Sequence, residues 1–227
     1  MQSAFPSNSR HKKNHKLTRS LVATILLLGL SLLIALNRQL ILDYIDFATY
    51  KPDGVMSAIV QRAGLNNTGK FIFYATQPEI EEGAQFNKKC ARLEEGTAVL
   101  GCYMSDKIYI YNVKDSRLDG IKEVTAAHEM LHAVYQRMSD AERKKVNDLV
   151  EAEYAKLSAN PRFADRMAFY ARTEPGERDN ELHSIIGTEV SGINPELEIH
   201  YAKYFVDRSR ILDLFNGYNS VFVEIEA

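Results

Sequence analysis

The sequence contains little cysteine, little net charge and no internal repeat. Two cysteines occur in 227 residues, and the formal net charge is −2 at pH 7. Because the charge is near neutral and no arginine-rich stripe with interleaved aromatic residues follows the N-terminal tail, we expect no nucleic-acid partner. The missing repeat excludes solenoid and propeller architectures. The composition instead predicts a globular protein with one well-buried domain and a short accessory segment.

The two cysteines, Cys90 and Cys102, lie close together in a region rich in turn residues. If this region is outside the membrane, we expect a disulfide that closes a loop of about a dozen residues and stabilises the fold by roughly 3 kcal/mol. The alternative is that the pair binds zinc, but no second Cys/His pair at metal-binding spacing lies nearby. The spacing alone leaves the redox state open.

The N-terminal segment predicts a membrane anchor. Residues 1–19 hold five Lys/Arg and no Asp/Glu, and the uncharged run 20–37 is bounded by Arg19 and Arg38. A helix over this run rises about 27 Å, enough to cross a bilayer core. A secretory signal peptide is the alternative, although its apolar core is normally shorter and ends in a small-x-small cleavage site. We expect an uncleaved transmembrane helix at 20–37.

This anchor predicts the location of the rest of the chain. Basic residues stay on the cytoplasmic side, so residues 1–19 are expected to be a cytoplasmic tail. The protein is then a single-pass protein of the cell membrane, and all that follows the helix is extracytoplasmic. Residues 38–54 are predicted to be a juxtamembrane linker with an amphipathic helix from 40 to 50.

Residues 55–227 predict one α+β domain, with a small N-terminal sheet followed by a mainly helical part. Aromatic and β-branched residues indicate strands at 70–76, 97–103 and 107–113, the last two joined by a hairpin-like turn. Hydrophobic periodicity, capping residues and prolines indicate helices at 55–64, 121–138, 139–158, 161–171 and 178–190, and a long one from Pro195 with Ile199, Tyr201, Phe205, Ile211 and Leu214 at core positions.

The helix expected at 121–138 carries an H-E-x-x-H pentad at 128–132. Residues four apart lie on one face of a helix, so His128 and His132 can direct their ring nitrogens at a single cation. Two neutral imidazoles suit zinc better than magnesium or calcium, which prefer oxygen ligands. Glu129 projects beside that cation and can act as the general base on a water of lowered pKa. The pattern predicts hydrolysis of peptide bonds.

A catalytic zinc needs a third protein ligand, and the helix expected at 178–190 offers Glu181, His183 and Glu189. At this point the sequence resembles the gluzincins, the thermolysin-like zinc metallopeptidases. In that family the pentad helix is followed by a helix whose Asn-Glu-x-x-Ser run supplies a glutamate ligand. Here Asn180, Glu181 and Ser184 match the run, so the resemblance implies a zincin-like fold with Glu181 as the third zinc ligand.

The match to the gluzincins departs from the family pattern at Ile185, where thermolysin-like enzymes have an aspartate that orients a metal-binding histidine. Asp179 or Glu189 is then the expected partner of a histidine N–H group. Residues 70–205 also resemble a family of bacterial membrane-anchored proteins that carry the pentad, which implies a location but no substrate. In zincins a strand bordering the cleft pairs with an extended substrate, and the strand expected at 107–113 is the candidate. Tyr170 and His183 are candidates for stabilising the oxyanion.

The sequence therefore predicts a membrane-anchored zinc metallopeptidase that acts on a peptide or protein substrate, and it predicts no oligomeric state. One alternative is a zinc-stabilised binding or scaffold module of the cell envelope that performs no hydrolysis. A second alternative is a structural membrane protein that binds no metal.

Overall fold

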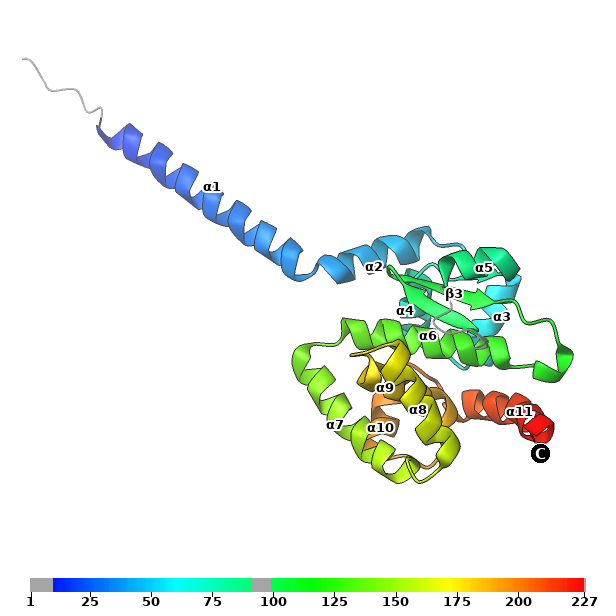
Figure 1. Ribbon diagram of the computed structural model, residues 1–227. Helices are drawn as coiled ribbons and strands as arrows, with labels where there is room; N and C mark the ends of the chain where they lie inside the picture. Colours follow the sequence, from blue (N-terminus) through cyan, green and yellow to red (C-terminus); the bar gives the residue numbers. More distant parts are fainter. Residues whose placement is uncertain (1–9, 91–98, 227) are drawn as a thin grey trace, which may run out of the picture. The chain divides into compact units, whose positions relative to one another are not determined.

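The computed structural model describes residues 10–90 and 99–226 (Figure 1). The chain forms two compact units, residues 1–42 and residues 43–227. The described part is mainly helical with one small sheet. The helices are α1 (Arg10–Leu36), α2 (Arg38–Thr49), α3 (Gly54–Arg62), α4 (Asn67–Ala75), α5 (Gly83–Lys89), η1 (Ser116–Leu118), α6 (Ile121–Arg137), α7 (Asp140–Leu157), α8 (Pro161–Thr173), α9 (Arg178–Glu189), α10 (Pro195–Tyr201) and α11 (Ser209–Glu226).

Helix α1 contains the predicted apolar run. Its segment Thr18–Leu36 is long and apolar enough to cross a membrane. The helix begins at Arg10, so the second half of the predicted tail at 1–19 is helical, and the first nine residues lie outside the described part. The predicted juxtamembrane helix is present as α2, and the first unit ends within it, at Leu42.

The sheet has the strand order β1-β3-β2, with β1 (Glu79–Glu81), β2 (Gly101–Met104) and β3 (Lys107–Tyr111). β1 runs parallel to β3 and β2 runs antiparallel to it. The turn between β2 and β3 is confirmed, and its two residues, Ser105 and Asp106, have positive φ angles of 52° and 62°, as the primed turns of hairpins require. β3 is therefore the central strand, and the prediction that it borders a cleft as an edge strand is wrong. Among the described residues the edge strands are β1 and β2, and β2 is the one that faces α6 most extensively.

One predicted strand, at 70–76, is instead helix α4. Asn66 caps this helix because its side chain accepts hydrogen bonds from the backbone N–H groups of Thr68 and Gly69. The aromatic density of the segment reflects burial, since Phe73 is completely buried and Tyr74 nearly so. The strand β1 was not predicted, because it is only three residues long and two of those are glutamates.

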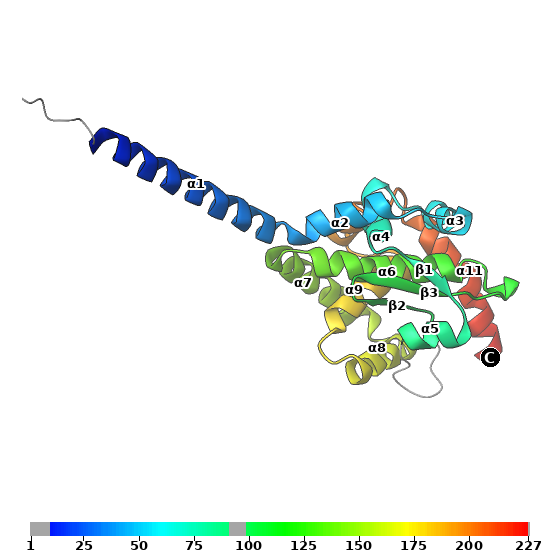
Figure 2. The same ribbon diagram turned by 90° about the horizontal axis from the view of Figure 1, so that it is seen from above.

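Helix α6 lies at the centre of the second unit, between the sheet on one side and α9 on the other (Figures 1 and 2). The predicted capping box at the start of α7 is confirmed, because Ser139 and Glu142 each bond to the other's backbone N–H. The long helix predicted from Pro195 is wrong, because α10 ends at Tyr201 and α11 begins at Ser209. Of its predicted core residues, Ile199 is 69% exposed, whereas Tyr201, Phe205 and Ile211 are buried.

Candidate metal centre

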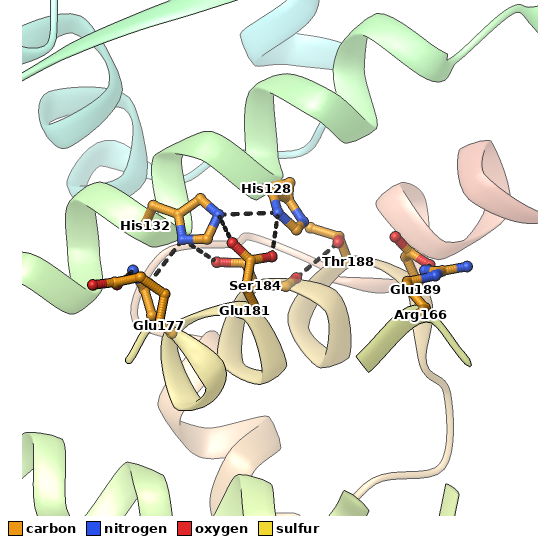
Figure 3. A network of polar contacts seen from close by, with 9 residues as sticks. His128, His132, Arg166, Glu177, Glu181, Ser184, Thr188 and Glu189 are labelled. Atoms are coloured by element: carbon orange, nitrogen blue, oxygen red, sulfur yellow. Dashed lines mark hydrogen bonds and ion pairs between the residues drawn. The ribbon is translucent and has the colours of Figure 1, made fainter. Parts of the chain in front are cut away.

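Helix α6 places His128 and His132 side by side, one turn apart, on the face that packs against α9 (Figure 3). Their ring centroids are 4.7 Å apart and their Nε2 atoms are 3.0 Å apart. The two histidine ligands predicted from the pentad are therefore brought together at their Nε2 atoms. This convergence follows directly from the spacing of four residues on a helix.

Helix α9 brings Glu181 to the same point. Glu181 Oε1 lies 3.3 Å from His132 Nε2, and Glu181 Oε2 lies 3.6 Å from His128 Nε2. The three residues form a group that could hold a metal ion, with one ligand atom from each within 4.8 Å of the others. The other two candidates for this position are not part of the group, because Glu189 forms an ion pair with Arg166 and His183 contacts His200.

The donor atoms lie close enough to share one cation. The two Nε2 atoms are 3.0 Å apart, and the two carboxylate oxygens of Glu181 lie 3.3 Å from His132 Nε2 and 3.6 Å from His128 Nε2. These distances are close to the roughly 3.3 Å that separates ligand atoms around a small tetrahedral ion. Glu181 is only 3% exposed, and its Oε2 atom has no hydrogen-bond partner among the described residues. A buried carboxylate oxygen without a partner is costly unless a cation is bound. The residues therefore fit a metal ion.

Asn180 and Ser184 orient the ring of His132. His132 Nδ1 lies 2.9 Å from Asn180 Oδ1 and 3.2 Å from Ser184 Oγ. Asn180 also donates a hydrogen bond from Nδ2 to Glu177, so its Oδ1 is the atom that faces the ring. An amide oxygen only accepts, and Nδ1 therefore carries the proton and leaves the Nε2 lone pair for a metal. The predicted role of Asp179 or Glu189 as histidine partner does not apply to His132.

Glu129 lies beside the histidines in the wall of the site. It is 6% exposed, and burial raises its pKa to about 8. The charge of His132 and the backbone of Tyr103 in β2 act in the opposite direction on this pKa. The strand passes so close at Gly101 that an added Cβ would lie 2.7 Å from Glu129 Oε1 and 2.5 Å from Thr125 Cγ2. A larger residue at this position of β2 therefore requires Glu129, Thr125 or the strand to move.

A pocket of about 510 Å³ opens at the three candidate ligands. Strand β2 lines it together with α6, α8 and α9, and no Lys or Arg occurs among the described lining residues. Two of its carboxylates were not assigned a role from the sequence. Glu177 holds Asn180, and Glu174 lines the pocket near Glu181. Burial and the neighbouring Glu181 raise the pKa of Glu174.

The two candidates for oxyanion stabilisation lie in different surroundings. Tyr170 lines the pocket, and burial, followed by the charges of Glu181 and Glu129, raises the pKa of its hydroxyl. Its hydroxyl thus stays protonated and can donate a hydrogen bond. His183 is completely buried, and its Nε2 lies 2.9 Å from His200 Nε2. His183 is not among the residues that line the pocket.

The predicted disulfide between Cys90 and Cys102 is confirmed, with the two Cα atoms 5.8 Å apart. Zinc ligation by the two cysteines is therefore wrong. The bond joins the end of α5 to β2, and both cysteines line the pocket. The disulfide thus holds the strand that contacts Glu129.

No protein-family model, curated protein or solved structure matches this chain.

Proposed function

We propose that this chain is a membrane-anchored zinc-dependent metallopeptidase of gluzincin type. The observation that carries the proposal is the placement of Glu129 in the wall of a pocket beside the group of His128, His132 and Glu181. A metal site that serves only folding is normally closed by four protein ligands. Here the site has three candidate ligands, it faces a pocket, and the carboxylate of Glu129 lies beside it. This arrangement favours catalysis.

The roles of the residues follow from their positions. His128, His132 and Glu181 would hold zinc, which when bound polarises a carbonyl and lowers the pKa of a water molecule. Glu129 takes a proton from the attacking water and passes it to the leaving amine. Tyr170 donates a hydrogen bond to the oxygen on which negative charge develops. The free edge of β2 is the candidate strand for pairing with an extended peptide substrate.

We also propose that α1 spans the cell membrane with its N-terminus in the cytoplasm. The apolar segment Thr18–Leu36 and the basic residues that precede it support this topology. The disulfide between Cys90 and Cys102 supports an oxidising compartment for the second unit, residues 43–227. The peptidase is thus expected to act outside the membrane.

Replacing Glu129 with Gln tests the proposal, because the amide keeps the size of the side chain and cannot act as a base. We expect the full chain, purified in detergent, to retain its zinc while cleavage of a broad peptide library falls roughly 10²–10⁴-fold. Elemental analysis measures the zinc and mass spectrometry measures the products. Glu196→Gln, an exposed position paired with Lys145, is the matched control and should retain both.

Two other outcomes would contradict the proposal. A parent protein that contains zinc but cleaves no peptide would favour a zinc-stabilised envelope module without hydrolytic activity. A parent protein without stoichiometric zinc would favour a structural membrane protein.

A further inference from the structure

The part of α2 that belongs to the second unit has its polar and apolar sides reversed. Asp43 is only 4% exposed and accepts two hydrogen bonds from Arg137, at 2.9 and 2.7 Å. Asp46 accepts a hydrogen bond from Gln77 Nε2 at 2.9 Å. In contrast, Tyr44 is 61% exposed and Ile45 is 53% exposed. A helix on the surface of a water-soluble domain normally has its acids outside and its apolar residues inside.

An aromatic cluster stabilises this arrangement. The rings of Tyr44 and Phe47 lie 4.9 and 5.1 Å from the ring of Phe71 in α4. Phe47 is itself 36% exposed. We call Tyr44, Ile45 and Phe47 the outer face of α2. Its side chains are presented outward while both aspartates hold the helix to the rest of the unit.

The length of the chain limits how far the outer face can be from a membrane that α1 would cross. The apolar segment of α1 ends at Leu36, and Tyr44 follows eight residues later. A fully extended chain of this length reaches about 29 Å, and a helical one rises about 12 Å. Because residues 38–49 are helical, the shorter distance applies, and the outer face begins roughly 12 Å along the chain from the end of the apolar segment, within reach of lipid headgroups.

We propose that the outer face of α2 binds the lipid interface of the membrane. This inference goes beyond the proposed peptidase activity and rests on the proposed membrane anchoring of α1. Helices of this kind bury their apolar side roughly 5–10 Å into the boundary between headgroups and acyl chains, and aromatic residues favour that depth. The contact restrains the unit 43–227, which would otherwise rotate about the end of its anchor.

The experiment uses the absence of tryptophan from the sequence. Single tryptophans are introduced into the full chain as Tyr44→Trp and, separately, as Ile45→Trp, and each variant is reconstituted in phosphatidylcholine vesicles. Lipids brominated either near the headgroups or near the bilayer centre quench a tryptophan that contacts them. Leu28→Trp, within the apolar segment of α1, is the positive control. Ile199→Trp, an equally accessible apolar position at 69% exposure in α10, is the matched negative control.

We expect bromines near the headgroups to lower the tryptophan emission of Tyr44→Trp and Ile45→Trp at least roughly two-fold. Bromines near the bilayer centre should lower it less, because the outer face lies at the interface. Ile199→Trp should keep its emission. Quenching of Leu28→Trp without quenching of Tyr44→Trp and Ile45→Trp would overturn the inference while leaving the anchor intact. If those two sites were also protected from a water-soluble quencher, a second copy of the chain or another protein would cover the face instead. Loss of quenching at Leu28→Trp would overturn the anchoring itself.

Discussion

Among the residues that the structure describes, two histidine pairs have nearly the same geometry and different surroundings. The Nε2 atoms of His128 and His132 are 3.0 Å apart, and those of His183 and His200 are 2.9 Å apart. The first pair lies beside Glu181 and lines a pocket. The second pair is enclosed by aromatic rings, those of Tyr135, Tyr201 and Tyr204.

The difference shows that the surroundings of two imidazoles, more than their separation, determine what they can bind. A metal ion needs a third ligand and an entry path. The first pair has both. The buried pair packs against aromatic rings, and burial lowers the pKa of His183 well below its usual value. We therefore interpret His183 and His200 as a neutral, hydrogen-bonded part of the core.

The strongest way to break this comparison is to make the first pair resemble the second. Glu181→Gln removes the carboxylate and leaves two histidines without a charged partner. We expect the zinc affinity to fall by more than roughly 100-fold. A loss of about 100-fold is the upper end of the range for mutating a residue that only orients a metal ligand. Competition with a zinc-binding dye measures the affinity. His200→Gln serves as the control and should bind zinc like the parent, and equal loss in both variants would contradict the distinction between the pairs.

Asn180 sharpens the comparison because it fixes one histidine of the first pair. Asn180→Ala removes the acceptor of His132 Nδ1 but leaves all three candidate ligands in place. We expect a drop in zinc affinity of roughly 10–100-fold. Asn180→Asp, which keeps an acceptor at this position, should recover most of the affinity. An unchanged affinity in Asn180→Ala would show that packing alone orients the ring.

The sequence could predict the first pair because its geometry is local. A spacing of four residues on a helix brings His128 and His132 together in any tertiary structure. Glu181 and Asn180 were predicted through the resemblance to gluzincins, by the Asn-Glu-x-x-Ser run. Gly101, Tyr103 and Glu174 were not assigned to the site, because their positions depend on how β2 and the end of α8 pack against α6 and α9.

The errors in the predicted fold have similar causes. The segment at 70–76 has the composition of a strand, but capping by Asn66 and burial of its aromatic residues stabilise a helix. The long helix predicted from Pro195 is divided by tertiary contacts. Arg208, between α10 and α11, is buried and donates a hydrogen bond to the carbonyl oxygen of Val190 at the end of α9. No local pattern in the sequence reveals that contact.

The first histidine pair also has a candidate general base beside it, Glu129, which the second pair lacks. Gly101 in β2 lies against this glutamate. Gly101→Ala places a methyl group against Glu129 and Thr125, so the carboxylate or the strand must move. Contacts this short must open by roughly half an ångström or more. Because a misplacement of 1 Å can cost about 100-fold in rate, we expect kcat to fall at least roughly ten-fold. Zinc content should be unchanged. Gly54→Ala, whose added Cβ has no atom within 4 Å, is the control, and equal rates in both variants would argue against this role of β2.

The smallest expected effect is on the pH dependence of the free energy of unfolding, through the buried His200 of the second pair. Burial, together with Lys203, lowers the pKa of His200 to about 4, although Glu142 acts in the opposite direction. The unfolded chain has the ordinary value of about 6.5 and therefore binds more protons, so the free energy of unfolding falls as the pH decreases through this range. Between about pH 7.5 and about pH 5.5 this contribution amounts to about 1 kcal/mol.

Denaturant unfolding of the full chain, in detergent with a chelator, measures this effect. The free energy of unfolding should fall more steeply on acidification in the parent than in His200→Gln. Identical losses would mean that His200 has the same pKa in the folded and the unfolded chain, so that burial does not keep the second pair neutral at acidic pH.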